Sequence, residues 1–201
     1  MATIFSIGHG NRTIGDFIEL VKKYEIRYLI DVRSRPYSRF NPAFSKEALD
    51  KSLGSHEIRY VFMGDALGGF PTSSACYTPD GRVDYSKLKL QASYLAGIER
   101  LKTAWQQGIS IGLMCSELKP QHCHRSKLIG VSLSEAGIPV LHIDETGEIK
   151  DQVWVMNEVK AEILGVVPGQ LSLFGDDREL TLTSRKRHNG TPAQGGSPDE
   201  L

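Results

Sequence analysis

Two cysteines, two histidines, a glutamate and an arginine lie within the eleven residues from Cys115 to Arg125, near the middle of the chain. Thiols and imidazoles supply nucleophiles and general bases near neutral pH, and a nearby arginine lowers a thiol pKa. Few loops bring so many groups with useful pKa values together. We therefore treat this stretch as the candidate site, in which Cys115, Glu117, Cys123 and His124 would carry the chemistry.

The residues on either side of this stretch predict a strand, a loop and a helix. Ile109 to Met114 is a short apolar run typical of a buried strand, and apolar residues recur at helical spacing after Ser126. In an open α/β sheet such a junction lies at the carboxyl edge, where ligands bind. Arg125 and Ser126, at the start of the helix, are therefore expected to bind an anionic group.

Two similar junctions come earlier in the chain. Thr3 to Ile7 and Tyr28 to Val32 predict strands, and an arginine-rich loop follows the second. Rigid guanidinium groups suit phosphate or carboxylate, although surface arginines and turn glycines are often only structural. If the carboxyl ends of these strands meet, His9 and Asp31 join the catalytic candidates. The additional candidates for binding an anionic substrate are Gly8, Asn11, Arg12, Arg33, Arg35 and Arg39.

The alternation of strands and helices predicts an α/β fold, a three-layer sandwich with a mainly parallel sheet of about five strands. Residues 1–165 would form this domain. Residues 166–201 are rich in polar residues, Gly and Pro, and are expected to form a flexible tail. The remaining predicted elements are helices over 45–53, 86–107 and 152–164, strands over 58–62 and 138–143, and a long binding or lid loop over 64–84.

Composition limits the possible partners and compartment. The chain has 24 Lys plus Arg and 24 Asp plus Glu, so no bulk charge draws it to nucleic acid. It has no apolar run long enough to span a membrane and no secretory leader pattern, so no membrane partner is expected. Three cysteines argue against a disulfide framework. These features predict a cytoplasmic protein with free thiols.

On three motifs the chain resembles the bacterial family called domain of unknown function 488. The motifs are Ile7-Gly8-His9-Gly10-Asn11-Arg12, then Asp31-Val32-Arg33-Ser34-Arg35-Pro36, and Cys115-Ser116-Glu117 followed by His122-Cys123-His124-Arg125-Ser126. The resemblance covers roughly residues 3 to 164. It implies an α/β sandwich and no settled activity.

A fainter similarity is to rhodanese-type sulfurtransferases, which share an Asp-Val-Arg strand end and a cysteine loop that runs into a helix beginning Arg-Ser. Those enzymes, like cysteine phosphatases, cradle their anion in a compact loop from cysteine to arginine. Here nine residues separate Cys115 from Arg125, and only His124 separates Cys123 from it. This departure weighs against a persulfide or phosphocysteine mechanism.

A separate resemblance lies in the predicted tail. Gln170, Leu171, Ser172, Leu173 and Phe174 match at all five positions the peptide by which bacterial replication and repair proteins bind the DNA sliding clamp. The apolar side chains would fill a pocket, while Gln170 would hydrogen-bond to its rim. This match makes the sliding clamp the expected partner.

Three functions are consistent with these features. The favoured one is a protein that processes nucleic acid or a nucleotide, is recruited through the clamp, and binds anions with its Arg/Cys/His site. The alternatives are a rhodanese- or phosphatase-like thiol enzyme acting on a small anion, and a non-catalytic nucleic-acid-binding adaptor. No cofactor is expected. Zinc at Cys115, Cys123 and His124 is a less favoured alternative, because the spacing fits no standard zinc motif.

Overall fold

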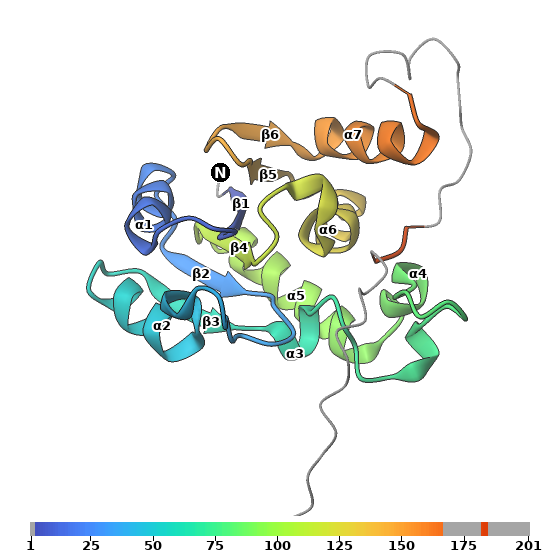
Figure 1. Cartoon of the computed structure of the whole chain (residues 1–201), viewed down its shortest axis with the longest axis horizontal. Coiled ribbons are helices and arrows are strands. Elements are labelled where there is room, and N and C mark those ends of the chain that lie inside the picture. The colour runs from blue at the N-terminus through green and yellow to red at the C-terminus, as the bar shows by residue number, and fades with distance from the viewer. Residues whose placement is uncertain (1–2, 167–181, 185–201) are drawn as a thin grey trace, which may run out of the picture.

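The computed structural model describes residues 3–166 and 182–184, which contain a six-stranded sheet flanked by helices (Figure 1). The strands are β1 (Ile4–Gly8), β2 (Tyr28–Asp31), β3 (Arg59–Phe62), β4 (Ile111–Cys115), β5 (Val140–Ile143) and β6 (Ile149–Asp151). The helices are α1 (Ile14–Lys23), α2 (Lys46–Gly54), α3 (Gly64–Leu67), α4 (Tyr85–Leu88), α5 (Ala92–Gln106), α6 (Val131–Glu135) and α7 (Gln152–Leu164). Short 3-10 turns cover Pro42–Phe44, Ser74–Cys76 and Pro120–His122, and Arg125–Gly130 forms a π-helical turn that leads into α6.

The sheet has the strand order β3-β2-β4-β1-β5-β6, and only β6 runs antiparallel to its neighbour. This confirms the predicted α/β sandwich with a mainly parallel sheet. The sheet has six strands rather than about five, because β6 was not predicted. Its three residues, Ile-Lys-Asp, are too few and too polar to show an apolar pattern.

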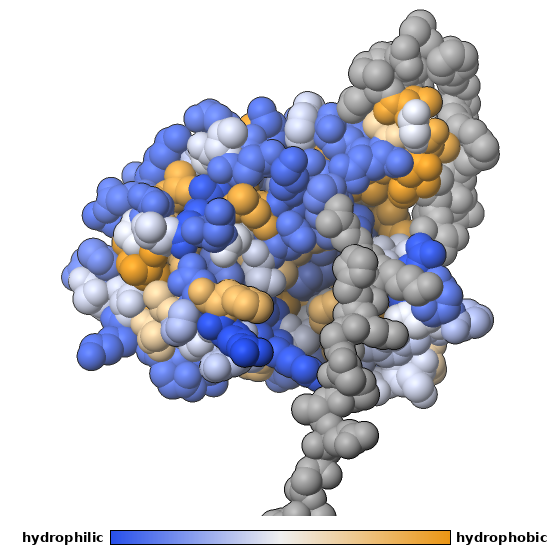
Figure 2. Space-filling model, viewed as in Figure 1, coloured by the Kyte–Doolittle hydropathy of each residue, from blue (hydrophilic) through white to orange (hydrophobic). Residues whose placement is uncertain are grey.

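Alternate residues of the central strands enter two hydrophobic cores on opposite faces of the sheet. Phe5 and Ile7 of β1 pack with α1 and α2, whereas Ile4 packs with residues of α3, α5 and α6. This alternation is the period of two expected for a strand covered on both faces. The surface seen in Figure 2 is mainly hydrophilic, with apolar side chains gathered in small patches. None of the described helices is long and apolar enough to cross a membrane.

The topology places a switch point between the adjacent strands β1 and β4. The chain leaves β1 through α1 toward β2, and it leaves β4 through α6 toward β5, on the other side of the sheet. Adjacent strands whose connections diverge in this way define a topological switch point, where ligands bind in open α/β sheets. The two strand ends are joined by hydrogen bonds of 3.0 Å from His9 N to Cys115 O and from Gly10 N to Ser116 O.

The prediction of one continuous helix over 86–107 is wrong, because the structure divides this segment into α4 and α5. The N–H groups of Leu90 and Gln91 donate to carbonyl groups only three residues back, at Lys87 and Leu88. Gln91 is then extended before α5 begins. This break leaves Leu90 exposed to solvent, although its spacing from the buried Tyr94 and Ile98 is helical.

Residues 182–184 contact the domain. Ser184 N donates to Val83 O at 2.9 Å, Val83 N donates to Ser184 Oγ at 2.8 Å, and Tyr85 N donates to Leu182 O at 3.2 Å. The proposed clamp peptide, Gln170 to Phe174, lies outside the described residues.

His142 in β5 connects the sheet to α7 and to the π-helical turn. Its ring nitrogens lie 2.9 Å from Ser6 Oγ and 2.6 Å from Gln152 Oε1, and Gln152 Nε2 donates to Ser126 O at 3.1 Å. Burial lowers the pKa of His142 to about 4, with a smaller contribution from the charge of Arg125. His142 is therefore neutral at pH 7 and has a structural role.

We expect the titration of His142 to destabilise the protein in acid. The unfolded chain takes up this proton near pH 6.5, whereas the folded protein takes it up only near pH 4, so stability falls as the pH drops between these values. The difference corresponds to about 3 kcal/mol. Urea unfolding between pH 7 and pH 4 should show a smaller decline for His142→Gln. Equal declines in the two proteins would contradict this assignment.

Candidate active site

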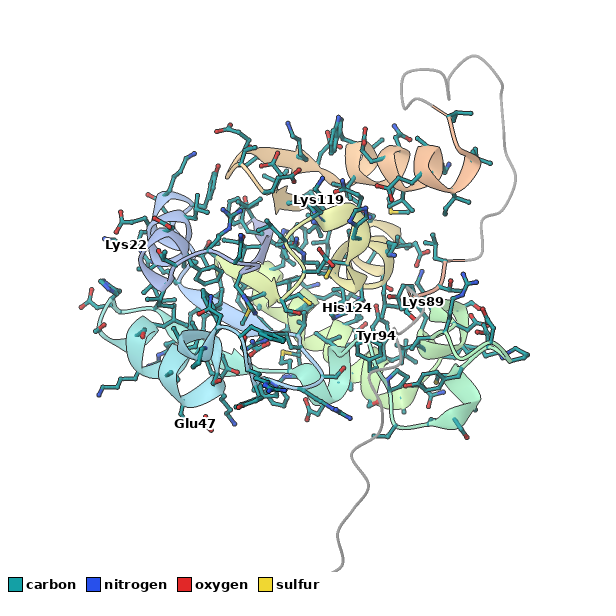
Figure 3. The ribbon with its side chains drawn as sticks, in the orientation of Figure 1. Lys22, Glu47, Lys89, Tyr94, Lys119 and His124 are labelled. Atoms are coloured by element: carbon teal, nitrogen blue, oxygen red, sulfur yellow. The ribbon has the colours of Figure 1, made fainter. Side chains whose placement is uncertain are left out.

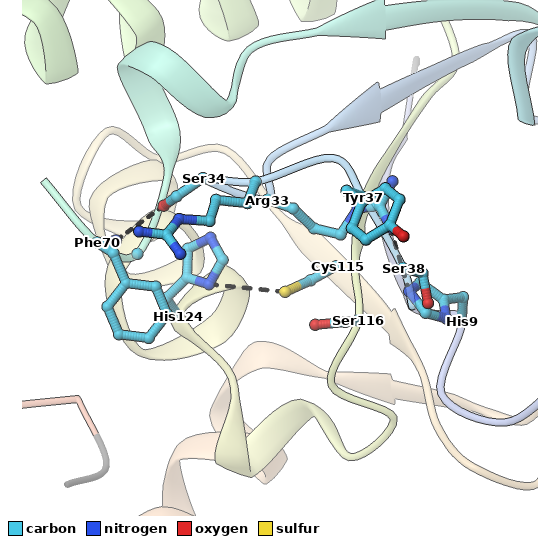
Figure 4. Close-up of a pocket in the computed structure, with 11 residues that line it drawn as sticks. His9, Arg33, Ser34, Tyr37, Ser38, Phe70, Cys115, Ser116 and His124 are labelled. Carbon is cyan, nitrogen blue, oxygen red and sulfur yellow. Dashed lines mark hydrogen bonds between the residues drawn. The ribbon is translucent and has the colours of Figure 1, made fainter. Parts of the chain in front are cut away.

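A pocket of about 410 Å³ opens at the carboxyl ends of β1, β2 and β4 (Figure 4). Its walls come from segments far apart in the sequence. They are His9 after β1, five residues of the loop 33–38, Gly69 and Phe70 after α3, and Cys115, Ser116 and His124 around the cysteine loop. Figure 3 places His124 near the centre of the molecule, whereas Lys22 and Glu47 lie at its periphery. The site is therefore built into the middle of the sheet edge.

The imidazole of His124 contacts both cysteines of the loop. Its Nδ1 lies 3.8 Å from Cys115 Sγ and 3.7 Å from Cys123 Sγ, and its Nε2 lies 3.0 Å from Val32 O. Because a carbonyl oxygen can only accept, Nε2 carries a hydrogen and donates to Val32. The lone pair of neutral His124 is thus on Nδ1, where it can accept the proton of Cys115.

The pKa values of the two buried thiols are shifted in opposite directions. A hydrogen bond from the Cys123 thiol, the charge of His124 and the backbone N–H of Glu117 hold the pKa of Cys115 well below its usual range, against the effect of burial. Burial and the neighbouring Cys115 raise the pKa of Cys123 well above its usual range. These opposite shifts favour Cys115 as the thiolate of the pair and Cys123 as its hydrogen-bond donor.

Asp31 and Arg33 form a buried ion pair. Arg33 Nη2 donates to Asp31 Oδ2 at 2.7 Å, and Arg33 Nε donates to Oδ1 at 2.9 Å. Tyr60 also donates to Oδ2 at 2.7 Å, and burial with this carboxylate raises the pKa of Tyr60. Asp31 therefore holds Arg33 in place, and its carboxylate is occupied by two residues, Arg33 and Tyr60.

His9 is held by Arg33 and by the ring of Phe44. The two rings stack with centroids 4.3 Å apart. The Nδ1 of His9 lies 3.0 Å from Gly10 O, so it carries the hydrogen, and Nε2 accepts from Arg33 Nη1 at 3.4 Å. Burial and the charge of Arg33 lower the pKa of His9, which keeps it neutral at the pocket wall.

The structure separates the arginines that were expected to meet in one pocket. Arg33 and Arg35 line it, whereas Arg12 donates to Asp144 O at 2.6 Å and to Gly8 O at 3.3 Å. Arg125 is fully buried and donates to Leu118 O at 2.9 Å, away from the lining residues. Of these anion-binding candidates, Arg33 and Arg35 therefore line the pocket, whereas Arg12 and Arg125 lie outside its lining.

The remaining candidates lie around the pocket rather than in its lining. Arg39 and Asn11 are exposed, and Glu117 is half-buried in the loop after β4. Ser126 donates to Cys123 O at 3.1 Å and to Pro120 O, which fixes the cysteine loop. A Cβ at Gly8 would lie 2.1 Å from Glu117 O, so only glycine permits β1 to end against this loop.

The cysteine loop could also hold a thiophilic metal ion. The donor atoms of Cys115, Cys123 and His124 lie within 4.8 Å of one another, and the His124–Val32 hydrogen bond would orient a histidine ligand. This is the one such cluster within residues 3–166 and 182–184, and it supplies three protein ligands. The absence of a cofactor stays a prediction.

Sequence reasoning missed several residues of the pocket wall. Ser34, Tyr37 and Ser38 lie in the arginine loop, Ser116 lies in the cysteine motif, and Gly69 and Phe70 lie in the long loop after α3. Ser34 Oγ accepts a hydrogen bond from Phe70 N at 2.9 Å, which joins two of these loops (Figure 4). The lack of periodicity over 64–84, typical of a binding loop, was the pattern that could have identified Phe70.

Fold and site together define an α/β protein with a Cys/His pocket at the switch point of its sheet. The chain matches the family model described as Domain of unknown function DUF488 over residues 13–131, more than half of its length. It therefore belongs to this family, as its motifs predicted. No curated protein and no solved structure gave a significant match.

Proposed function

We propose that this protein is a thiol-dependent enzyme that acts on nucleic acid or a nucleotide. The observation that carries the proposal is the contact of Cys115 with His124 on the wall of the pocket. A thiolate next to an imidazole is the arrangement used for nucleophilic catalysis, with the third group here being the Val32 carbonyl that orients the ring. In this proposal the Cys115 sulfur bonds to an electrophilic centre of the substrate as the leaving group of that centre departs. His124, which holds the proton from Cys115, donates it to the leaving group.

The pocket supports a substrate with an anionic group. Arg35 is exposed and lines it, and Ser34, Ser38 and Ser116 add hydroxyl groups along its wall. A volume of about 410 Å³ is within the range of small-molecule sites, roughly 300–1,000 Å³. A phosphate bound to Arg35 would place the rest of a nucleotide beside Cys115.

The alternatives have less support. A cradle of the phosphatase type needs the arginine that follows the cysteine to face it, but the guanidinium of Arg125 binds Leu118 O instead. A non-catalytic adaptor gives no reason for a buried cysteine of lowered pKa on a pocket wall.

Recruitment to DNA is the second part of the proposal. It rests on the five matching residues from Gln170 to Phe174. The clamp would concentrate the enzyme on newly made or repaired DNA without a basic surface, which agrees with the zero net charge of the chain.

Ligand protection tests the function of the pocket. We expect thymidine 5′-monophosphate to slow the alkylation of Cys115 by iodoacetamide several-fold, because a phosphate on Arg35 covers the entrance to the thiolate. Arg35→Ala should lose this protection, whereas Arg100→Ala, which removes an exposed arginine of α5, should keep it. An alkylation rate that does not depend on the nucleotide at any concentration would reject the proposal.

A further inference from the structure

The loop between β2 and α2 presents an arginine and an aromatic ring at the tip of a fixed turn. Asn41 N donates to Ser38 Oγ at 3.1 Å, which closes a turn with Arg39 and Phe40 at its centre. Phe40 is 96% exposed, the highest value among the large apolar side chains of the described residues. Burial of apolar surface stabilises a fold, so a ring held this far out gives no benefit to the chain alone.

Other hydrogen bonds hold the base of this turn. Ser38 N donates to Ser45 Oγ at 3.2 Å, and Lys46 N donates to Pro36 O at 2.9 Å. Asn41 Nδ2 donates to Arg12 O at 3.0 Å, which attaches the loop to the segment after β1. The exposed ring of Phe40 therefore lies on a loop that hydrogen bonds hold in place.

The pocket next to this turn has two further aromatic walls. Tyr37 and Phe70 lie on opposite sides of the opening, with the sulfur of Cys115 between them (Figure 4). Tyr37 is 73% exposed and Phe70 is 45% exposed, so each offers a ring face or edge to a ligand. Ser34 fixes the position of Phe70 through the hydrogen bond to its backbone N–H.

We infer that this aromatic–arginine surface, made of Arg35, Tyr37, Arg39, Phe40 and Phe70, binds single-stranded nucleic acid and leads one nucleotide to Cys115. The inference rests on the proposed function of the pocket and specifies its substrate. The pocket has room for about one nucleotide. Arg39 and Phe40 lie outside its lining, directly after Ser38 on the same loop, where we place the next nucleotide.

A single strand fits this surface better than a duplex. Bases of a single strand are free to stack on aromatic rings, whereas those of a duplex are already stacked on each other. Arg35 and Arg39 provide two exposed cations for the phosphates between such bases. Because the net charge of the whole chain is zero, binding must depend on these few local contacts.

Binding of a labelled single strand of twelve thymidine nucleotides to the full chain, measured by fluorescence anisotropy, tests the inference. Phe40→Ala should weaken binding about 5- to 150-fold, the range found for loss of one base-stacking ring. The slope of log affinity against log salt should be about −1.4 for two phosphate contacts, and Arg39→Ala should reduce its magnitude by about 0.7. The same sequence as a blunt duplex should bind more weakly.

Matched variants control for unspecific effects. Trp154→Ala removes a half-exposed ring from α7, and Arg100→Ala removes an exposed cation from α5; neither should change binding. Phe40→Ala should keep the melting temperature, since the ring is exposed. It should also keep the alkylation rate of Cys115, which reports the proposed catalytic group separately.

Three results would overturn the inference. The first is that Phe40→Ala and Arg39→Ala bind the oligonucleotide with the wild-type affinity. The second is that the duplex binds as tightly as the single strand. The third is that Arg100→Ala weakens binding as much as Arg39→Ala does, which would mean an adventitious electrostatic attraction. If oligonucleotides fail to bind while thymidine 5′-monophosphate still protects Cys115, the surface inference fails and the proposed function stands. If oligonucleotides fail to bind and thymidine 5′-monophosphate does not protect Cys115, both the surface inference and the proposed function are rejected.

Discussion

Replacing Arg33 by methionine is expected to lower the free energy of unfolding by about 3–5 kcal/mol. Asp31 is fully buried and Arg33 is only 5% exposed, so the substitution leaves a carboxylate in the interior without its counter-charge. It also removes the hydrogen bonds of Arg33 to Phe44 O and to the His9 ring. Urea denaturation at pH 7 measures the effect.

The exposed pair Arg82–Asp80 provides a matched control. Its atoms are also 2.7 Å apart, but both side chains are nearly half exposed. Arg82→Met should therefore cost only about 0–1 kcal/mol. The double variant Asp31→Leu/Arg33→Met should regain much of the stability, because neither buried charge remains. An equal, small loss for Arg33→Met and Arg82→Met would show that the buried pair does not support the site.

Changing Leu173 and Phe174 together to alanine is expected to abolish binding to the sliding clamp. Short peptides that order on binding keep only part of their contact energy, so we expect micromolar affinity, about −8 kcal/mol. The two side chains would contribute roughly 1.5–3 kcal/mol each when buried in the clamp. Their combined loss, roughly 3–6 kcal/mol, would raise the dissociation constant from micromolar to between about 0.2 and 30 mM. Titration calorimetry with the purified clamp measures this.

Ser172→Ala serves as the matched control for this experiment, because it changes the peptide without removing an apolar anchor. The double variant should keep the melting temperature of the domain. A fall of several degrees would mean that the peptide packs on its own domain, and clamp binding that survives the double change would contradict the recruitment proposal.

The sequence predicted the parts of the fold that follow from local patterns. The strands β1, β2 and β4 were recognised from short apolar runs, and the convergence of His9, Asp31 and Cys115 followed from parallel topology. The start of α1 likewise has a local cause, since Thr13 is followed three residues later by Asp16, and Thr13 Oγ1 accepts from Asp16 N at 3.1 Å.

Other features depend on tertiary contacts that no periodicity encodes. The π-helical turn over 125–130 buries all six of its residues, including Ser126 and Lys127, which a 3.6-residue pattern would place in solvent. The burial of Arg125 under the cysteine loop could not be foreseen, because arginine is rarely enclosed. The role of Val32 comes from a backbone carbonyl, which carries no sequence identity.

The pH dependence of Cys115 alkylation tests the central claim of a thiolate most directly. Iodoacetamide modification would be followed by mass spectrometry of the peptide containing Cys115, with and without prior chelation to detect a bound metal. We predict an apparent pKa well below that of a free cysteine, about 8.5. Cys123→Ala should raise it by removing the thiol donor, whereas Cys123→Ser, which retains a hydroxyl donor, should raise it less. An apparent pKa at or above 8.5 in the wild-type protein, or alkylation that begins only after chelation, would contradict the thiolate assignment and the mechanism built on it.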